Sequence, residues 1–334
     1  RLALLAHAAG NAGGVRSRAP VRSNPVKTDI AQTITATILE KLEAGTKPWV
    51  QPWTGCPQRR PLRHCGTAYR GINTVVLWMA AKACGYASPY WMTYRQAEAL
   101  GGQVRRGEKC NHAVLYKAID AKEAHGDASA MPSDESPTKR RVLRAFAIFN
   151  ADQIDGLPAK YVVTPAPIEP MAESVHRPKL EAFFSRLPAT VRHVGLAAYY
   201  NRTRDEIILP PIERFASYDG YFATRAHETA HWTGHEKRLD RTFGKRFGDQ
   251  AYAFEELVAD IASAILGAEL GLPEAELDNH AAYLNHWITV LSSDKNAILT
   301  AASKADEAVD HMMGFGQAGS NRIVEHRTVA LETA

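Results

Sequence analysis

Five consecutive residues in the second half of the chain, His227-Glu228-Thr229-Ala230-His231, carry two imidazoles and a carboxylate at a spacing that suits metal-dependent hydrolysis. Residues i and i+4 of a helix lie on one face, so His227 and His231 can bind a single ion. Glu228 then lies beside water that the ion activates, and it can take that water's proton as general base. Because so short a pattern also arises by chance, the neighbouring sequence must supply a third ligand.

A helix predicted over residues 253–270 supplies that ligand. Glu256 and Asp260 are four residues apart, so we expect Glu256 to complete the metal site and Asp260 to orient one of the imidazoles. Glu255 is the rival ligand, but the residue four positions after it is Ala259, which favours Glu256.

The same region argues against a site with a third histidine. Gly234 fits the longer histidine motif, but Lys237 stands where its last ligand would be. The sequence therefore predicts a gluzincin-type site for one Zn²⁺ ion, with Mn²⁺ or Co²⁺ as alternatives. The competing interpretation is a surface helix with two solvated histidines.

The elements that must position this motif follow the order of a zinc peptidase, with strands before the metal-binding helix. The second half opens with a helix near residues 176–187, and strand-like runs follow at 197–200 and 205–210. Three helices are predicted between residues 218 and 312.

The first half alternates helices with extended segments. Helices are predicted over 29–44 and 72–83, and Thr93 can cap a short helix that ends at Gly101. Residues 103–119 predict a hairpin with its turn at 106–109, and residues 141–149 predict a strand.

These elements indicate an α+β protein of two domains. Residues 27–157 and 175–315 would form the domains, with a proline-rich linker over 158–174. Residues 1–26, with four arginines and no acid, would form a disordered basic tail, and residues 316–334 a C-terminal tail.

Charge differs sharply between the halves. Residues 27–150 carry a net charge of +8 and residues 151–334 carry −8, so the whole-chain value of +4 conceals two different surfaces. A basic domain can attract polyanions, of which nucleic acid is the commonest, although a solvated basic surface explains the charge equally well. No apolar run reaches the ~18 residues of a membrane span, so no membrane partner is expected. Four irregularly spaced cysteines suit the reducing cytoplasm.

Aromatic residues are interleaved with the basic ones. Nine Trp and Tyr residues fall within 49–117, and bases of single-stranded DNA can stack on such rings while cations follow the phosphates. Several of these rings can equally belong to the core, as Trp78 does within its apolar helix. The candidates for DNA contact are Trp49, Trp53, Tyr69 and Trp91, together with Arg105, Arg106 and Lys109.

Short motifs occur throughout both halves: Lys47-Pro48-Trp49, Tyr69-Arg70-Gly71-Ile72-Asn73, Trp91 to Ala97, Gly101 to Glu108, Phe149-Asn150 with Gln153, His227 to His235, Arg238-Leu239, and Tyr252 to Asp260. With these motifs, over roughly residues 27–315, the chain resembles the ArdC-type antirestriction proteins of conjugative plasmids, whose front domain also occurs in plasmid primases.

This resemblance implies a single-stranded DNA-binding domain joined to a zincin-like metallopeptidase domain, in a protein that protects incoming plasmid DNA from host restriction. It adds Arg70 and Asn73 to the DNA-binding candidates. The family usually has a second glutamate where this chain has Asp260, a shorter carboxylate that can still reach an imidazole.

Two functions follow from these patterns. The first is an enzyme that cleaves a protein, such as an unknown host factor that attacks entering DNA. The second is a non-proteolytic protein that coats single-stranded DNA, or a primase-associated DNA-binding module, with a structural or vestigial metal site.

Overall fold

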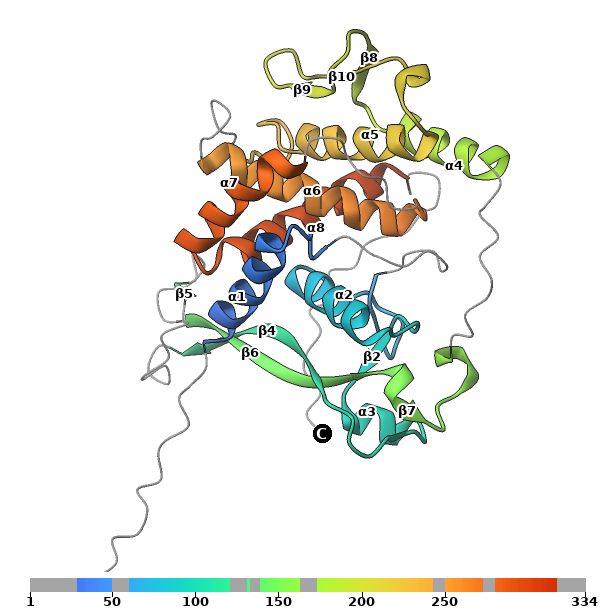
Figure 1. Cartoon of the computed structure of the whole chain (residues 1–334), viewed down its shortest axis with the longest axis vertical. Helices are drawn as coiled ribbons and strands as arrows, with labels where there is room; N and C mark the ends of the chain where they lie inside the picture. The colour runs from blue at the N-terminus through green and yellow to red at the C-terminus, as the bar shows by residue number, and fades with distance from the viewer. Residues whose placement is uncertain are drawn as a thin grey trace, which may run out of the picture.

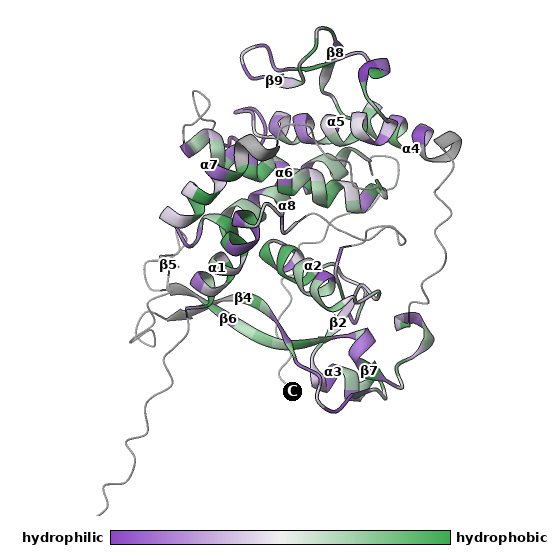
Figure 2. Ribbon diagram, in the orientation of Figure 1, coloured by the Kyte–Doolittle hydropathy of each residue, from purple (hydrophilic) through white to green (hydrophobic). Residues whose placement is uncertain are grey.

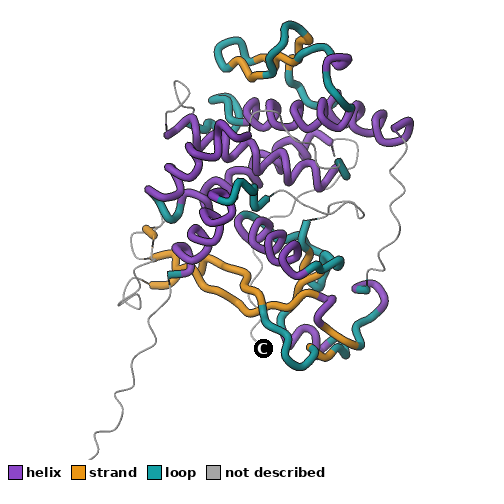
Figure 3. The backbone as a smooth tube through the Cα atoms, viewed as in Figure 1, coloured by secondary structure: helices purple, strands orange, loops and turns teal. Residues whose placement is uncertain are grey.

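The computed structural model describes residues 29–49, 60–120, 131–132, 139–162, 173–242, 250–272 and 280–316 (Figure 1). Helices and sheets are mixed throughout this part of the chain, which confirms the predicted α+β class. The strands gather at two opposite ends of the molecule, with most of the helices between them (Figure 3). Among the described residues, no helix is both long and apolar enough to cross a lipid bilayer.

The first half is built on a sheet with the strand order β1-β2-β6-β4, to which β5 adds beside β6. Its elements are α1 (Ile30–Glu43), β1 (Leu62–Arg63), α2 (Ile72–Cys84), β2 (Tyr90–Met92), α3 (Tyr94–Ala99), β3 (Gln103–Val104), β4 (Asn111–Asp120), β5 (Met131–Pro132), β6 (Lys139–Asn150) and β7 (Ile154–Asp155). The predicted helices are present, and Thr93 caps α3 by accepting a hydrogen bond from the backbone of Gln96.

The predicted hairpin over 103–119 is wrong. β3 pairs with β7, while β4 pairs with β6 along ten residue pairs from Asn111 with Ile148 to Asp120 with Lys139. A tight turn does exist at Gly107, whose φ is +89°. Alternation identifies a strand but not its partner, and here β7 lies about 50 residues beyond β3, while the paired residues of β4 and β6 are 19 to 37 positions apart.

The second half combines a small sheet with a stack of helices. Its elements are α4 (Glu173–Ser185), β8 (Thr190–His193), β9 (Tyr199–Asn201), β10 (Glu206–Leu209), α5 (Tyr218–Thr233), α6 (Gln250–Leu270), α7 (His280–Ser293) and α8 (Ala297–Gly316). β10 lies between a parallel β8 and an antiparallel β9, so β9 is an edge strand. The sequence predicted neither β8 nor the fourth helix that follows residue 217.

One apolar core extends across both halves. Ile38 of α1, Trp49 and Val75 of α2 belong to the same cluster of buried residues as Ile261 of α6. Trp49 packs edge-on against Trp287 of α7 at 5.5 Å between ring centroids. Figure 2 shows apolar, green stretches on α2, α6 and α8, and α8 contacts both of the other two helices. The boundaries of the two predicted domains stay a prediction, and in this structure the two halves pack through a shared interior.

Ion pairs also join the halves. Each pairs a cation with a carboxylate from the other half of the chain: Lys47 with Asp260, Arg60 with Asp306, Arg70 with Asp310, and Lys295 with Asp29. Part of the charge difference between the halves is therefore neutralised within the molecule.

Candidate metal centre

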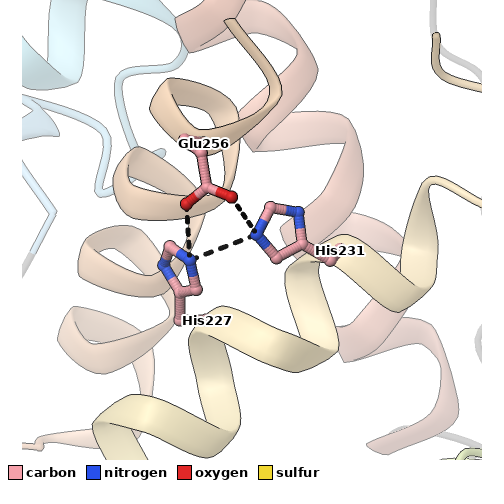
Figure 4. A group of neighbouring side chains, drawn as sticks. All are labelled: His227, His231 and Glu256. Carbon is pink, nitrogen blue, oxygen red and sulfur yellow. Dashed lines mark hydrogen bonds and ion pairs between the residues drawn. The ribbon is translucent and has the colours of Figure 1, made fainter. Parts of the chain in front are cut away.

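Helix α5 carries the two histidines in its last turns. Ser217 caps the start of the helix by accepting a hydrogen bond from the backbone of Gly220, and the helix ends at Thr233. This frame sets His227 and His231 one turn apart, with both rings directed toward α6 (Figure 4). Glu256, from the second turn of α6, points between them.

These three side chains form a compact triangle in which each oxygen of the Glu256 carboxylate faces one imidazole. The two Nε2 atoms are 3.2 Å apart, His227 Nε2 is 3.4 Å from Glu256 Oε2, and His231 Nε2 is 3.4 Å from Glu256 Oε1. Zinc binds nitrogen and oxygen at ~2.0–2.2 Å, so two ligands of a tetrahedral zinc are about 3.3 Å apart. Each of these spacings is close to that distance, and these residues fit a divalent metal.

The charges around the triangle also suit a cation. Burial by itself would lower the pKa of His231, but the carboxylates of Glu256 and Glu255 outweigh it and raise that pKa to about 10. Burial would raise the pKa of Glu256, yet the two histidines hold that pKa well below its usual range. The carboxylates thus favour positive charge on His231, and the histidines keep Glu256 ionised as a metal ligand requires.

Glu255 orients His231, a role that the sequence did not suggest. Its Oε1 lies 3.2 Å from His231 Nδ1, which leaves Nε2 for an ion. Arg241 holds the other side of this carboxylate through two hydrogen bonds of 3.0 and 2.7 Å. Both side chains are buried, and Arg241 also donates to the carbonyl of Ala230 in α5. The spacing of residues in the motif does not predict Arg241, because Arg241 follows the end of α5 and returns to the site only through the fold of the chain after the helix.

The prediction that Asp260 orients an imidazole is corrected by the structure. Its carboxylate accepts hydrogen bonds from Lys47 Nζ, at 3.0 Å, and from Trp49 Nε1. The Nδ1 atom of His227 is buried and has no hydrogen-bond partner. The segment after α1, far away in the sequence, places the Lys47 ammonium and the Trp49 indole against the turn of α6 that carries Asp260.

Glu228 is buried beside the triangle, where a general base is required. Burial raises the pKa of its carboxyl, and the backbone N–H of Tyr200 in the edge strand β9 donates a hydrogen bond to it. A raised pKa makes the carboxylate a stronger base, as proton abstraction from water requires. The role of Glu228 stays a prediction that this placement supports.

A second ionic cluster fixes β9 and β10 to the end of α5. Arg238 donates to both carboxylate oxygens of Asp205, at 3.0 Å from Nη1 and through a shorter bond from Nη2. Its Nε donates to the carbonyl of Trp232, and Tyr200 Oη donates to Asp205 at 2.7 Å. The cluster holds Tyr200, and with it the N–H that reaches Glu228.

Several predicted DNA-stacking rings are not available at the surface. Trp49 is 0% exposed and Trp91 is 1% exposed, because Trp49 fills the shared core and Trp91 sits in the middle of β2 against Tyr86. Tyr69 is buried in the same cluster as Trp91. These three predictions are therefore wrong as surface contacts, while Trp53 lies outside the described residues.

The polar DNA-binding candidates divide into two groups. Arg70 pairs with Asp310, and Arg105 pairs with Glu108 at 2.7 Å, so carboxylates of the chain already neutralise both. Asn73 bridges α2 and β4 by donating to and accepting from the backbone of Val114, at 2.8 and 2.7 Å. Arg106 and Lys109 are exposed.

Two family models match the chain. One is described as a zincin-like metallopeptidase and matches residues 178–304. The other is described as the N-terminal domain of anti-restriction factor ArdC and matches residues 28–149. The first range contains the whole triangle, and the second contains α1, α2 and almost all of the five-stranded sheet.

Similar proteins and structures cover most of the chain. An uncharacterised protein of Sinorhizobium fredii, y4eC, is 37% identical over 297 residues, which span 87% of this chain and 94% of that protein. A DNA primase TraC of Escherichia coli is 39% identical over 306 residues, but these make up only 28% of the primase. The metal-free crystal structure of the antirestriction protein ArdC from plasmid R388 is 42% identical, with a TM-score of 0.70, and covers 88% of this chain and 100% of that one. The Mn(II)-bound structure of the same protein has the same identity and TM-score, with coverages of 86% and 98%.

Proposed function

The chain belongs to the ArdC family of antirestriction proteins, and from that premise we propose that it binds single-stranded DNA and carries a metal-dependent peptidase site. Both activities would serve the protection of incoming plasmid DNA in the cytoplasm. The observation that carries the peptidase half is the triangle of His227, His231 and Glu256, with Glu228 buried beside it. Its protein substrate would be a host factor that acts on entering DNA.

The residues of the site have separate tasks in this proposal. A divalent ion held by His227, His231 and Glu256, Zn²⁺ first and Mn²⁺ or Co²⁺ as alternatives, would polarise the peptide carbonyl and activate water. Glu228 would accept the proton of the attacking water and pass it to the leaving amine, a transfer that its raised pKa favours. Glu255 would keep the His231 ring in the orientation that presents Nε2.

The small sheet supplies a natural place for an extended peptide. β9 is an edge strand, and its Tyr200 N–H already reaches Glu228. An extended peptide can add to such an edge through backbone hydrogen bonds, which requires little of its side chains. Tyr199, which is exposed on the same strand, would contact the peptide's side chains.

The DNA half is supported by the match of residues 28–149 to the ArdC N-terminal domain and by the basic charge of that region. The TraC primases match 87% of this chain but over only 28% and 20% of their own length, so the matched region, which extends well beyond residues 28–149, forms one part of larger proteins. A second candidate function, protection by coating the DNA without proteolysis, uses the same DNA surface and leaves the metal site structural.

The experiment that tests the peptidase half uses the full chain, loaded in turn with Zn²⁺, Mn²⁺ and Co²⁺, and a fluorescently labelled unfolded protein as probe. Loaded protein should cleave the probe, and a chelator should stop the cleavage. Glu228→Gln should keep its metal content and lose roughly 10²–10⁴-fold in rate, because the proton acceptor is gone. Glu236→Gln, which changes an exposed glutamate just after the motif, is the matched control. Equal rates in Glu228→Gln and wild type would refute the assignment, and no cleavage by any loaded form would favour the coating function.

A further inference from the structure

Two large apolar side chains on the hairpin of β4 and β6 are exposed, although both lie on strands. Leu115 is 43% exposed and Phe146 is 44% exposed. Other rings of the first half that sequence alone would offer to DNA, such as Trp49 and Trp91, are buried in the core. Figure 1 shows this hairpin as a long curved ribbon along the side of the molecule opposite the small sheet.

The register of the hairpin puts these side chains on one face, together with a cation. Leu115 pairs directly with Arg144, and Ala113 pairs with Phe146. Directly paired residues share a face, and so do residues two apart on one strand, such as Arg144 and Phe146. Arg144 is exposed, and its guanidinium makes no ion pair within the described residues. We name Leu115, Arg144 and Phe146 the hairpin platform.

Charge around the hairpin platform indicates an anionic occupant. The two strands contain five cations against one acid, Asp120, and the cations are Lys117, Lys139, Arg140, Arg141 and Arg144. Arg106 and Lys109, just before β4, are exposed as well. Arg105, in the same turn, is paired with Glu108, and Arg70 is paired with Asp310.

An exposed ring beside an uncompensated cation is the combination that single strands require. An unpaired base can stack on a ring while the neighbouring phosphate meets the cation. Duplex bases are stacked on one another and offer the protein only phosphates and groove edges. An apolar protein partner would explain the two apolar side chains but not the excess of cations.

We infer that the hairpin platform is a contact site for single-stranded DNA, with one base on Phe146 against Leu115 and an adjacent phosphate on Arg144. The inference rests on the proposed DNA-binding function and assigns it to a surface. Phe146, and not the buried rings of Trp49 and Trp91, is then the side chain on which a base stacks.

The test measures binding of the full chain to a fluorescent oligothymidylate and to a duplex of equal length, over a range of salt concentrations. Phe146→Ala should weaken single-strand binding by roughly 5- to 150-fold, the range for one stacked base, and leave the salt slope unchanged. Arg144→Ala should lower the salt slope by about 0.7, the value for one phosphate of a single strand. Phe146→Tyr keeps a ring and should bind like wild type.

Matched controls come from the second half. Leu196→Ala removes an exposed apolar side chain, and Arg214→Ala removes an exposed cation; both should bind like wild type. Thermal unfolding of each variant identifies any loss of fold, and Phe146→Tyr and Arg144→Ala still test the platform if Phe146→Ala unfolds.

Three outcomes overturn the inference; the first two leave the proposed function standing, and the third removes both. If wild type binds the single strand and all platform variants bind equally well, the DNA site lies elsewhere while the function stands. If light scattering shows an oligomer that Phe146→Ala dissociates without loss of DNA binding, the platform contacts a second copy of the chain. If wild type itself does not bind single-stranded DNA, the DNA half of the proposed function fails and the platform assignment fails with it.

Discussion

Glu255 lies between His231 and the buried Arg241, and its contribution to metal binding can be tested by a single substitution. Its carboxylate lies between His231 Nδ1 and Arg241, with both contacts buried. Removal of a carboxylate that orients a metal-binding histidine typically costs 10–100-fold in affinity. We therefore expect Glu255→Ala to raise the zinc Kd by roughly 10- to 100-fold, measured by competition with a chromophoric chelator.

This expectation reverses the one drawn from spacing, in which Glu255 was only a rival ligand of little consequence. Glu256→Ala should weaken binding more than Glu255→Ala, since it removes a ligand atom rather than a support. Glu236→Ala, an exposed glutamate near the same helix end, controls for the loss of one negative charge. Wild-type affinity in Glu255→Ala would show that Arg241 and the helix alone hold the ring in place.

The sequence was informative about this site where its geometry is local. The spacing of His227 and His231, and the choice of Glu256 over Glu255, follow from helical periodicity, and the structure brings these three side chains together. Arg241, Lys47 and Trp49 reach the site from other parts of the chain. Their arrival depends on tertiary packing, which no spacing rule describes.

The aromatic residues illustrate a different limit. A tryptophan that stacks on bases and a tryptophan that fills a core look the same in the sequence, and a neighbouring Pro or Gly does not distinguish the two. Trp49 also has its indole N–H satisfied by Asp260, which stabilises the buried position. Register, which places Leu115 opposite Arg144, was the information that the sequence lacked.

At the scale of elements, the β9–β10 hairpin depends on Asp205 and Arg238. The hydrogen bond from Arg238 is the main reason that the pKa of Asp205 falls from 3.8 to about 2. A folded-state pKa below the unfolded value contributes stability above about pH 4, and this is lost as pH falls toward 2. We expect Asp205→Asn to lower the free energy of unfolding at pH 7 by about 1–2 kcal/mol, after allowance for partial exposure.

Urea unfolding of both proteins between pH 7 and pH 2.5 measures this difference, which should shrink below about pH 4. Asp240→Asn is a close control, because Asp240 is exposed and, like Asp205, has a positive φ. A constant difference at all pH values would mean that the side chain contributes through its shape rather than its charge. A fall in peptide hydrolysis alongside the loss of stability would support the link from this cluster, through Tyr200, to Glu228.

Elements with strong helical periodicity were predictable, and strand partners were not. Ile30, Ile34, Ile38 and Leu42 repeat every fourth residue, and α1 forms over that range. β4 was identifiable as extended, but its partner β6 lies beyond an insertion that carries no pairing signal. β8 was missed because only one of its four residues, Val191, is an aliphatic that marks a strand.

At the scale of the whole molecule, the basic residues of the first half fall into two groups: some form ion pairs with the second half, and others stay exposed. Four of the ion pairs described above join the basic first half to the acidic second half. Among the exposed cations of the first half, Arg106, Lys109 and Arg144 lie on or just before the β4–β6 hairpin, which is at the end of the molecule opposite the small sheet that borders the metal site (Figure 1). A polyanion can therefore bind one end while a peptide occupies the other, without competition for the same surface.

This separation leads to the last prediction, which concerns whether protection requires hydrolysis. Glu228 is not one of the three residues of the triangle, so Glu228→Gln should leave metal content and fold unchanged. It lies far from the hairpin platform in the fold, so affinity for single-stranded DNA and its salt slope should also match wild type. If hydrolysis is needed, the variant should bind DNA normally and yet fail to protect a plasmid that enters a restricting host, measured as transfer frequency. Arg144→Ala and Phe146→Ala should show the opposite combination, with an intact metal site and weakened DNA binding.

Full protection by Glu228→Gln, together with loss of protection in these platform variants, would mean that the protein acts by coating the strand. Proteolysis would then have to be abandoned as the mechanism.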